Sequence, residues 1–392
     1  MKEYLNRKKY VRAGNGKEEV MRVTYSMMVK NMAYWSSKQS EKLNNAETIV
    51  ASGKQVNKPS DDPEAAGQIL ADRTTISKYA QYESNISQAQ TWIEESDTTL
   101  STVSTLLQDA KDILSSVSSA DSTTKASYLQ ELTNIYNEVI SYANTSSSSG
   151  YMYSGNDSTV MPFANNVQVS GGTASDIVFD LSGAATDVSI EITDSTGTVV
   201  RTLTATSGVE GTNTIAWDGC DDSGTTLSDG NYNFTVTASN SAGDAVASYP
   251  SYRGGEGGKI VITGENSSVV LNNNGGEIFS NALNVLSQTI TVLNNTDTSS
   301  TVISDLSASL KDAVSQIETE EVALSNKNAL LGNSTSRLDE LTTYVKSRIS
   351  DTENCDTTTA SAELTAQETA YETTESATVS VLKMSTLKDY LS

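Results

Sequence analysis

The sequence predicts an α+β protein in which helices from both ends of the chain pair into a coiled-coil rod, with a β region in the middle. Three observations carry this prediction. A seven-residue apolar spacing runs through residues 76–117, and a second one occupies the last third of the chain. Between about residues 151 and 280 the apolar period changes to two, which is typical of strands.

Composition narrows the possible functions. The chain has 392 residues, enough for two or three domains, and no stretch apolar enough to span a membrane. Its net charge of −23 argues against nucleic acid or an anionic membrane as a partner. The absence of histidine removes the commonest general base and most transition-metal sites, so we expect neither an enzyme nor a metal or cofactor site. Cys220 and Cys355 lie far apart in unlike segments, which makes a disulfide framework improbable.

The first heptad seam is interrupted by a single small polar residue, Ser96. A narrow apolar stripe of this kind requires a partner helix. The last third of the chain supplies that partner. The residues at one heptad position in the two seams are Ile86, Ile93, Leu100, Leu107 and Leu114, and then Leu310, Ile317, Leu324, Leu331, Leu338 and Val345.

The chain begins with a basic segment, residues 1–20, which lacks the apolar core of a secretory signal. Met21 opens a segment of different character. Either Met21 is the true start, or residues 1–20 are a short disordered arm; neither alternative gives them a folded role.

A helical pattern begins at Arg22. The residues on one predicted face are Met28, Met32, Trp35, Leu43, Ala46 and Ile49 or Val50. Gly53 can end this helix. Asp62 is a good N-cap with Pro63 at the first helical position, so the next helix should begin there. Helix capping is therefore a better explanation of Asp61 and Asp62 than a catalytic carboxylate pair.

The remaining elements follow in order. A second helix centred on residues 129–140 should return antiparallel to the heptad helix. Alternating segments such as 189–192 and 233–236 predict strands around a small sandwich core that Trp217 fills. A further β segment covers 259–271, and helix is expected again from Ala282. The final helix, about residues 360–391, has a thin apolar face and is too polar to be stable alone.

Four acidic residues in the middle raise a calcium hypothesis: Asp218, Asp221, Asp222 and Asp229. The EF-hand pattern fails because Cys220 stands where an oxygen ligand is needed. Turn chemistry explains these residues better than a metal site.

The arrangement resembles the flagellin-like axial proteins of the bacterial flagellum, and within them the hook–filament junction family, hook-associated protein 3. Flagellins usually show an Asn-Ser-Ala-Lys-Asp-Asp-Ala type of stretch, where this chain has Lys-Pro-Ser-Asp-Asp-Pro. The motifs that carry the resemblance are Arg22-Val23-Thr24; Gly53; Pro59-Ser60-Asp61-Asp62-Pro63; Asn85-Ile86; Tyr153-Ser154-Gly155 with Pro162-Phe163; Tyr252-Arg253-Gly254; Gly275-Gly276 with Phe279; Leu338; Leu387; and Asp389-Tyr390-Leu391.

The middle of the chain departs from that family. Residues 177–247 resemble the immunoglobulin-like module of the flagellar hook-capping protein, on cues that include Trp217-Asp218-Gly219 and Asp229-Gly230-Asn231-Tyr232. The module looks like an insertion into the outer β domain.

The resemblance implies a domain plan. Residues 21–58 and 355–392 form a terminal coiled-coil domain, 59–150 and 281–354 a helical rod, and 151–280 a β outer domain that contains the Ig-like insert, 165–248. The terminal helices are expected to be largely disordered in the free subunit and to order against neighbouring subunits. Export through the flagellar type III secretion apparatus to the outside of the cell is also implied.

The implied function is a structural ring between hook and filament. Its partners are other copies of the chain, hook-associated protein 1, flagellin and a flagellar export chaperone. Two alternatives stay open: a flagellin that forms the bulk filament, and a surface binding module that acts through the β insert. An enzyme is the least favoured class because no catalytic constellation is present.

Overall fold

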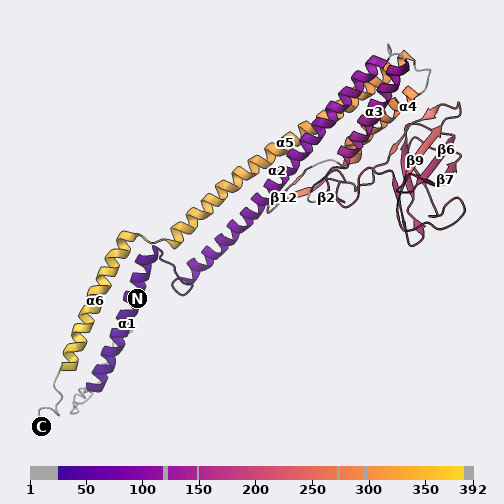
Figure 1. Cartoon of the computed structure of the whole chain (residues 1–392). Coiled ribbons are helices and arrows are strands. Elements are labelled where there is room, and N and C mark those ends of the chain that lie inside the picture. The colour runs from indigo at the N-terminus through magenta and orange to yellow at the C-terminus, as the bar shows by residue number, and fades with distance from the viewer. Residues whose placement is uncertain (1–24, 118–121, 148–149, 272–273, 295–298, 384–392) are drawn as a thin grey trace, which may run out of the picture. The chain divides into compact units, whose positions relative to one another are not determined.

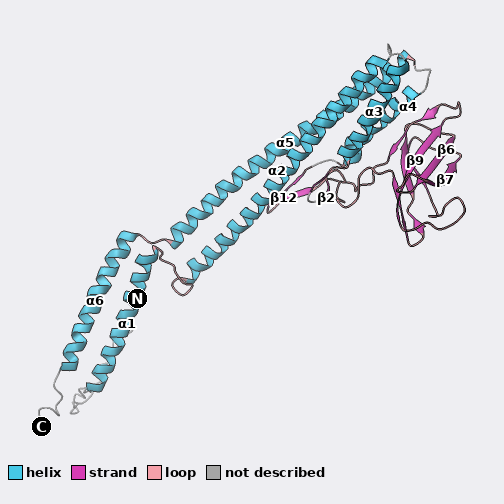
Figure 2. Cartoon of the chain, in the orientation of Figure 1, coloured by secondary structure: helices cyan, strands magenta, loops and turns pink. Residues whose placement is uncertain are grey.

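A computed structural model describes residues 25–117, 122–147, 150–271, 274–294 and 299–383 of the chain. These residues fall into two compact units, one drawn from residues up to Ile76 and from Thr342 onward, the other from Ser77–Leu341. The helices are α1 (Tyr25–Ser52), α2 (Pro63–Val117), α3 (Ser122–Ala143), α4 (Gly275–Asn294), α5 (Ser300–Glu353) and α6 (Thr357–Lys383). Strands lie only between α3 and α4 in the described sequence (Figure 2), so the α+β prediction is confirmed.

The second unit has a helical core made by α2, α3, α4 and α5 (Figure 1). Every predicted heptad residue of the first seam, from Ile86 to Val117, is buried, and so are Leu310 to Leu338 on α5. The two seams belong to one apolar cluster, which α3 joins through Leu132 and Val139. Burial of one such leucine contributes about 1.5–3 kcal/mol, so this cluster is the main stabilising feature of the unit.

Ser96, the polar break in the first seam, has a structural role. Its hydroxyl lies 3.1 Å from the Tyr153 hydroxyl, which also donates to the Ser96 carbonyl at 3.3 Å. A larger apolar residue at this position would displace the tyrosine and leave its buried hydroxyl unpaired. Burial raises the pKa of Tyr153 to about 12, with the hydrogen bond to Ser96 acting in the opposite direction.

The Ig-like part of the second unit is a sandwich with its own core. The larger sheet has the strand order β4-β3-β9-β6-β7 with β10 on β9, and the smaller one has the order β11-β5-β8. Trp217 is buried between them, as predicted, and makes an edge-to-face contact with Tyr232 at 5.7 Å. The strands are β3 (Asn166–Ser170), β4 (Thr173–Ala174), β5 (Ile177–Leu181), β6 (Asp187–Thr193), β7 (Val199–Ala205), β8 (Gly211–Ile215), β9 (Gly230–Ser239), β10 (Ala245–Val246) and β11 (Ser248–Pro250).

Register follows the predicted alternation. Ile190 and Ile192 of β6 are buried and pair with Val236 and Phe234 of β9. Two small hairpins complete the β structure, β1 (Ser146–Ser147) with β2 (Gly150–Tyr151), and β12 (Ile260–Gly264) with β13 (Ser267–Val270).

Two sequence predictions are wrong. Helix resumes at Gly275 rather than Ala282, because the Asn274 side chain accepts from the Glu277 amide at 3.0 Å and caps α4 early. Trp35 was expected on the buried face of the first helix but is 61% exposed, with its ring 5.5 Å from that of Tyr34. The contact face of α1 is narrower than the apolar pattern suggested, since α6 is the helix that packs against it (Figure 1).

The start of α2 gives a first testable prediction. Asp62 Oδ1 accepts from the amides of Glu64 and Ala65, both at 3.0 Å, so it is the N-cap of a helix that begins at Pro63. Asp62→Ala should lower the free energy of unfolding by about 1 kcal/mol in chemical denaturation, since two amide groups lose their acceptor. Asp62→Asn keeps an acceptor oxygen and should retain most of the stability; equal losses in both variants would contradict the capping role.

Candidate assembly sites

The predicted family-motif residues separate into three groups in the structure. Gly53 and the 59–63 motif lie in one loop of the first unit. Asn85 and Leu338 lie on α2 and α5 in the second unit. The others fall outside the described residues: Arg22, Val23, Thr24, Leu387, Tyr390 and Leu391.

The loop between α1 and α2 is shaped by its glycine and its two aspartates. Gly53 has a φ of +68°, the left-handed conformation that ends α1 as predicted. Asp61 Oδ2 accepts from the amides of Asn57 at 3.0 Å and Lys58 at 2.8 Å. Helix capping is therefore confirmed for Asp62, whose acceptors bind amides of α2, whereas Asp61 stabilises the loop that precedes the helix.

Glu353, the last residue of α5, binds this loop through both its side chain and its backbone. Its side chain accepts from Lys54 Nζ at 2.7 Å and from Arg73 NH2 at 2.9 and 3.1 Å, although the residue is only 8% exposed. Its backbone carbonyl accepts from the Gln55 amide at 2.7 Å, and the Cys355 amide donates to the Gly53 carbonyl at 3.0 Å. We call the loop 53–62 together with residues 353–356 the joint.

A second charged pair lies beside the joint. Asp72 of α2 is 3% exposed and accepts from Arg348 Nε of α5 at 2.8 Å, with a further contact from the guanidinium NH2. Neither pair is predictable from the sequence, because the members are about 280 residues apart and follow no heptad position.

The local stability of the joint should depend on pH through the Glu353 carboxyl. The hydrogen bond from Lys54 is the largest influence on Glu353 and lowers the pKa of its carboxyl below the ordinary 4.5; burial opposes this, and Arg73 adds to the lowering. A carboxyl with a lowered folded-state pKa contributes stability above its unfolded pKa and loses it as pH falls through the folded value. We therefore expect local unfolding at the joint, followed by hydrogen exchange, to rise as pH falls below about 4. Because the intrinsic exchange rate of an amide itself falls from pH 7 to pH 3, the quantity to compare is the protection factor, and unchanged protection factors at Gln55 and Cys355 would contradict this.

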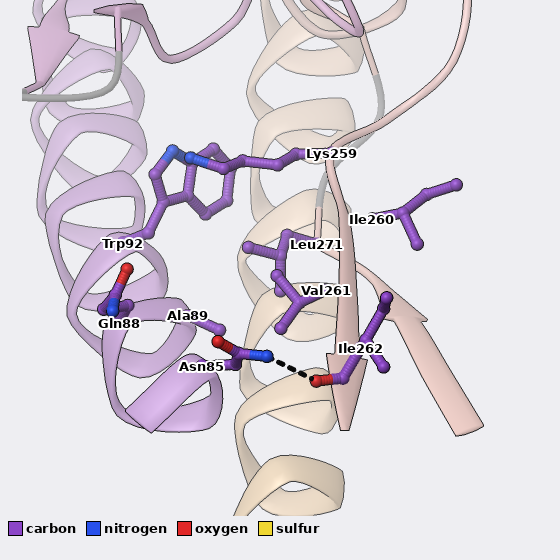
Figure 3. Close-up of a pocket in the computed structure, with 9 residues that line it drawn as sticks. All are labelled: Asn85, Gln88, Ala89, Trp92, Lys259, Ile260, Val261, Ile262 and Leu271. Carbon is purple, nitrogen blue, oxygen red and sulfur yellow. Dashed lines mark hydrogen bonds between the residues drawn. The ribbon is translucent and has the colours of Figure 1, made fainter. Parts of the chain in front are cut away.

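Asn85 lies at a cavity between α2 and β12. Its side-chain amide donates to the Ile262 carbonyl at 3.2 Å (Figure 3). The cavity has a volume of about 270 Å³, and Figure 3 shows the Lys259 side chain directed toward Trp92. The bond ties the hairpin to α2, so a structural role explains Asn85. The cavity is lined by Asn85, Gln88, Ala89, Trp92, Lys259, Ile260, Val261, Ile262 and Leu271.

The aromatic and glycine motifs, which are separate in the sequence, meet in one cluster. Tyr153 and Phe279 make an edge-to-face contact at 4.8 Å, and Phe163 lies 5.6 Å from Tyr252. Phe163 and Tyr252 also form an antiparallel bridge where the chain enters and leaves the Ig-like region. The Asn144 side chain holds Phe163 in place through two hydrogen bonds. Its Nδ2 donates to the Phe163 carbonyl at 2.6 Å, and its Oδ1 accepts from the Phe163 amide at 2.9 Å.

Of the aspartates in the calcium hypothesis, Asp218 and Asp221 form local turns, while Asp222 and Asp229 accept from amides of distant segments. Asp221 Oδ1 accepts from the Ser223 hydroxyl at 2.7 Å and from the amides of Ser223 and Thr225 at 2.9 and 2.8 Å. The Ser223 hydroxyl is the largest influence that lowers the pKa of this carboxyl, followed by the Thr225 amide. Asp229 Oδ1 accepts from the Gly171 amide at 2.9 Å, and Asp218 Oδ1 from the Cys220 amide at 3.0 Å. In the described part of the chain, no three acidic, cysteine or histidine side chains gather as metal ligands.

Two family models match the sequence. Residues 23–158 match the bacterial flagellin N-terminal helical region. The first third of the chain is therefore similar to the flagellin-like helical region. Residues 164–242 match the FlgD Ig-like domain, which covers the sandwich and agrees with the resemblance seen in the sequence.

Solved structures with similar folds include flagellar proteins. A putative flagellar hook-associated protein from Vibrio parahaemolyticus is 16% identical over 75% of this chain and 100% of its own, with a TM-score of 0.46. Bacillus cereus FlgL is 13% identical over 71% of this chain and 99% of its own, with a TM-score of 0.45. FlgD from Xanthomonas campestris is 24% identical over 28% of this chain and 78% of its own, with a TM-score of 0.22. No curated protein matches the flagellin-like chain.

None of the described helices of this flagellin-like protein combines the length and apolarity that a membrane crossing requires.

Proposed function

We propose that this flagellin-like protein forms the ring that joins hook and filament. The observation that carries the proposal is the combination of a flagellin-type helical region with an Ig-like domain of the hook-capping type in one chain. The Pro59–Pro63 bracket, typical of the junction family rather than of flagellins, supports the same assignment. The ring consists of copies of this chain, with hook-associated protein 1 on the hook side and flagellin on the filament side.

Localisation tests this proposal. An antibody against the Ig-like region should label one narrow band at the base of each filament in electron micrographs. Labelling along the entire filament would support the flagellin alternative instead. Stoichiometry gives a second readout, because a junction protein is a trace component of sheared filaments whereas a flagellin is their main band.

We propose the predicted route and domain plan as parts of the same function. The chain is exported through the flagellar type III secretion apparatus, with an export chaperone, and acts outside the cell. Residues 21–58 and 355–392 order against neighbouring subunits, 59–150 with 281–354 form the rod, and 151–280 is the outer domain. The family motif residues, from Arg22-Val23-Thr24 to Leu387 and Tyr390-Leu391, serve assembly. A variant that lacks residues 387–392 should remain soluble but fail to enter flagella; normal filaments from it would contradict this role.

The Ig-like region carries the second candidate function, binding at the flagellar surface. The region is bounded by the Phe163–Tyr252 bridge and has a core of its own, so its removal takes only Tyr249 from the buried residues of the helical core. We favour a spacer role, because Asp221 and Asp229 accept hydrogen bonds from backbone amides of the region itself. Replacing residues 165–250 with a two-residue Asn-Gly turn should preserve incorporation into flagella. Loss of adhesion to glycans or host proteins in that variant, with incorporation unchanged, would favour the binding module.

A further inference from the structure

The arm, which we define as α1 and α6, has little to hold it together. Among the α1 residues whose burial is described, 26–52, Ala46 is the one buried apolar residue, and α6 has no buried residue within its described length. Several large apolar side chains face solvent, including Trp35 and, at 53% exposure, Leu382. Two helices with so little buried apolar surface gain too little to offset the entropy of ordering.

The joint has the stabilising contacts that the arm lacks. Val56 of the loop packs with Ala66 and Ile69 of α2 and with Ile349 of α5. Backbone hydrogen bonds join the loop to residues 353–356: the Cys355 amide donates to the Gly53 carbonyl, and the Gln55 amide donates to the Glu353 carbonyl. Lys54 and Asn354 form an isolated antiparallel β-bridge between the same two segments. The joint is therefore a small folded core at the point where both arm helices meet the rest of the first unit.

Glu353 is the residue that ties these parts together. It belongs to α5, receives Lys54 from the loop and Arg73 from α2, and offers its carbonyl to Gln55. Other charged groups near the joint do not bind the Glu353 carboxylate. Asp72 pairs with Arg348, and Lys58 lies at the rim of the 180 Å³ cavity that Glu353 also lines.

We propose that the joint folds in the lone subunit and acts as a staple, in which Glu353 holds the ends of α1 and α6 side by side for assembly. The inference rests on the proposed function and refines it: the arm orders only against neighbouring subunits, whereas residues 53–58 and 355–356, at the edge of the segments that order on assembly, are already folded. Holding two chain segments at one point raises the effective concentration of each for the other. It also reduces the entropy that assembly must offset.

Hydrogen exchange on the lone full-length subunit tests the first half of this proposal. At pH 7 the amides of Gln55 and Cys355 should be protected, while those of the outer arm, residues 25–40 and 365–383, should exchange freely. Glu353→Gln should accelerate exchange at Gln55 and Cys355 by at least about tenfold, because a charged acceptor is lost. Glu372→Gln, at an exposed position of α6, is the matched control and should change nothing.

Incorporation into flagella tests the second half. Glu353→Gln should lower the amount of the chain in sheared filaments at least about fivefold, while thermal unfolding of the Ig-like and helical cores stays unchanged. A disulfide can replace the lost contact in the Glu353→Gln variant. Lys54→Cys and Asn354→Cys are added to that variant, with Cys220 and Cys355 changed to Ser so that only the new pair can form a disulfide. Oxidation of this pair should restore incorporation. Bridged residues of this kind are within disulfide distance.

Three outcomes would overturn the staple. They are unprotected joint amides in the lone wild-type subunit, an arm already protected in that subunit, and full incorporation of Glu353→Gln. The junction role is judged separately by the position of the antibody band, so the two proposals can fail independently.

Discussion

Leu331→Ala should lower the free energy of unfolding of the helical part of the second unit by about 2–5 kcal/mol. Leu331 is on the α5 seam, is 0% exposed and belongs to the cluster shared by α2, α3, α4 and α5. Removing three carbons there leaves a cavity in a close-packed apolar core, which the surrounding side chains fill only in part. Guanidinium unfolding followed by far-ultraviolet circular dichroism measures the effect on helix content.

The adjacent residue provides the control for that substitution. Leu330 has the same chemistry and lies on the same helix, but it is 51% exposed. Leu330→Ala should therefore change the free energy of unfolding by no more than about 0.5 kcal/mol. Similar losses in the two variants would contradict the assigned α2–α5 seam, because helix propensity changes equally in both.

Gly155→Ala should be the most damaging substitution at the aromatic cluster, with an expected loss of about 2–5 kcal/mol. Gly155 has a φ of +65°, which a residue with a Cβ adopts at a cost of about 1–2 kcal/mol. A Cβ at this position would also overlap the backbone carbonyl oxygen of Gly255 and lie 2.7 Å from that of Gly257. Backbone atoms on both sides cannot move aside as a flexible side chain would. Thermal unfolding monitored by near-ultraviolet circular dichroism reports on the Tyr153 and Phe279 rings nearby.

Gly257 separates backbone strain from the steric overlap. Its φ is +100°, but a Cβ there would meet nothing within 4 Å. Gly257→Ala should therefore show the strain alone, about 1–2 kcal/mol. If both alanine variants lose the same stability, the close approach of the 155 and 255 backbones is not what requires glycine.

The heptad seams were predictable because an apolar stripe with a period of seven has one stable solution, a partner helix with a matching stripe. The residues from Ile86 to Val117 and from Leu310 to Leu338 were found in the sequence and are buried. Local turn chemistry was predictable for a similar reason. Gly53 and Asp62 act on amides and dihedral angles within a few residues of themselves, so no distant contact is needed to assign them.

Predictions failed where a local sequence pattern did not reveal which other segment of the chain packs against it. Trp35 fits the apolar face of α1, but α6 contributes only a narrow contact, so the ring stays exposed. The Gly275-Gly276 pair favours a turn by composition, yet Asn274 caps a helix there and Gly275 fits against the Tyr153 carbonyl.

The sequence alone determined that helices from both ends pair, where the β region lies, and that its sandwich core contains Trp217, because hydrophobic period and turn residues specify these features locally. Only the tertiary structure decided that Glu353 joins Lys54 to Arg73, that Asp72 pairs with Arg348, and that Gly155 meets Gly255. These contacts join residues about 100 to 300 positions apart, and no periodic pattern marks the members. Their identity depends on which surfaces the folded chain brings within a few ångströms.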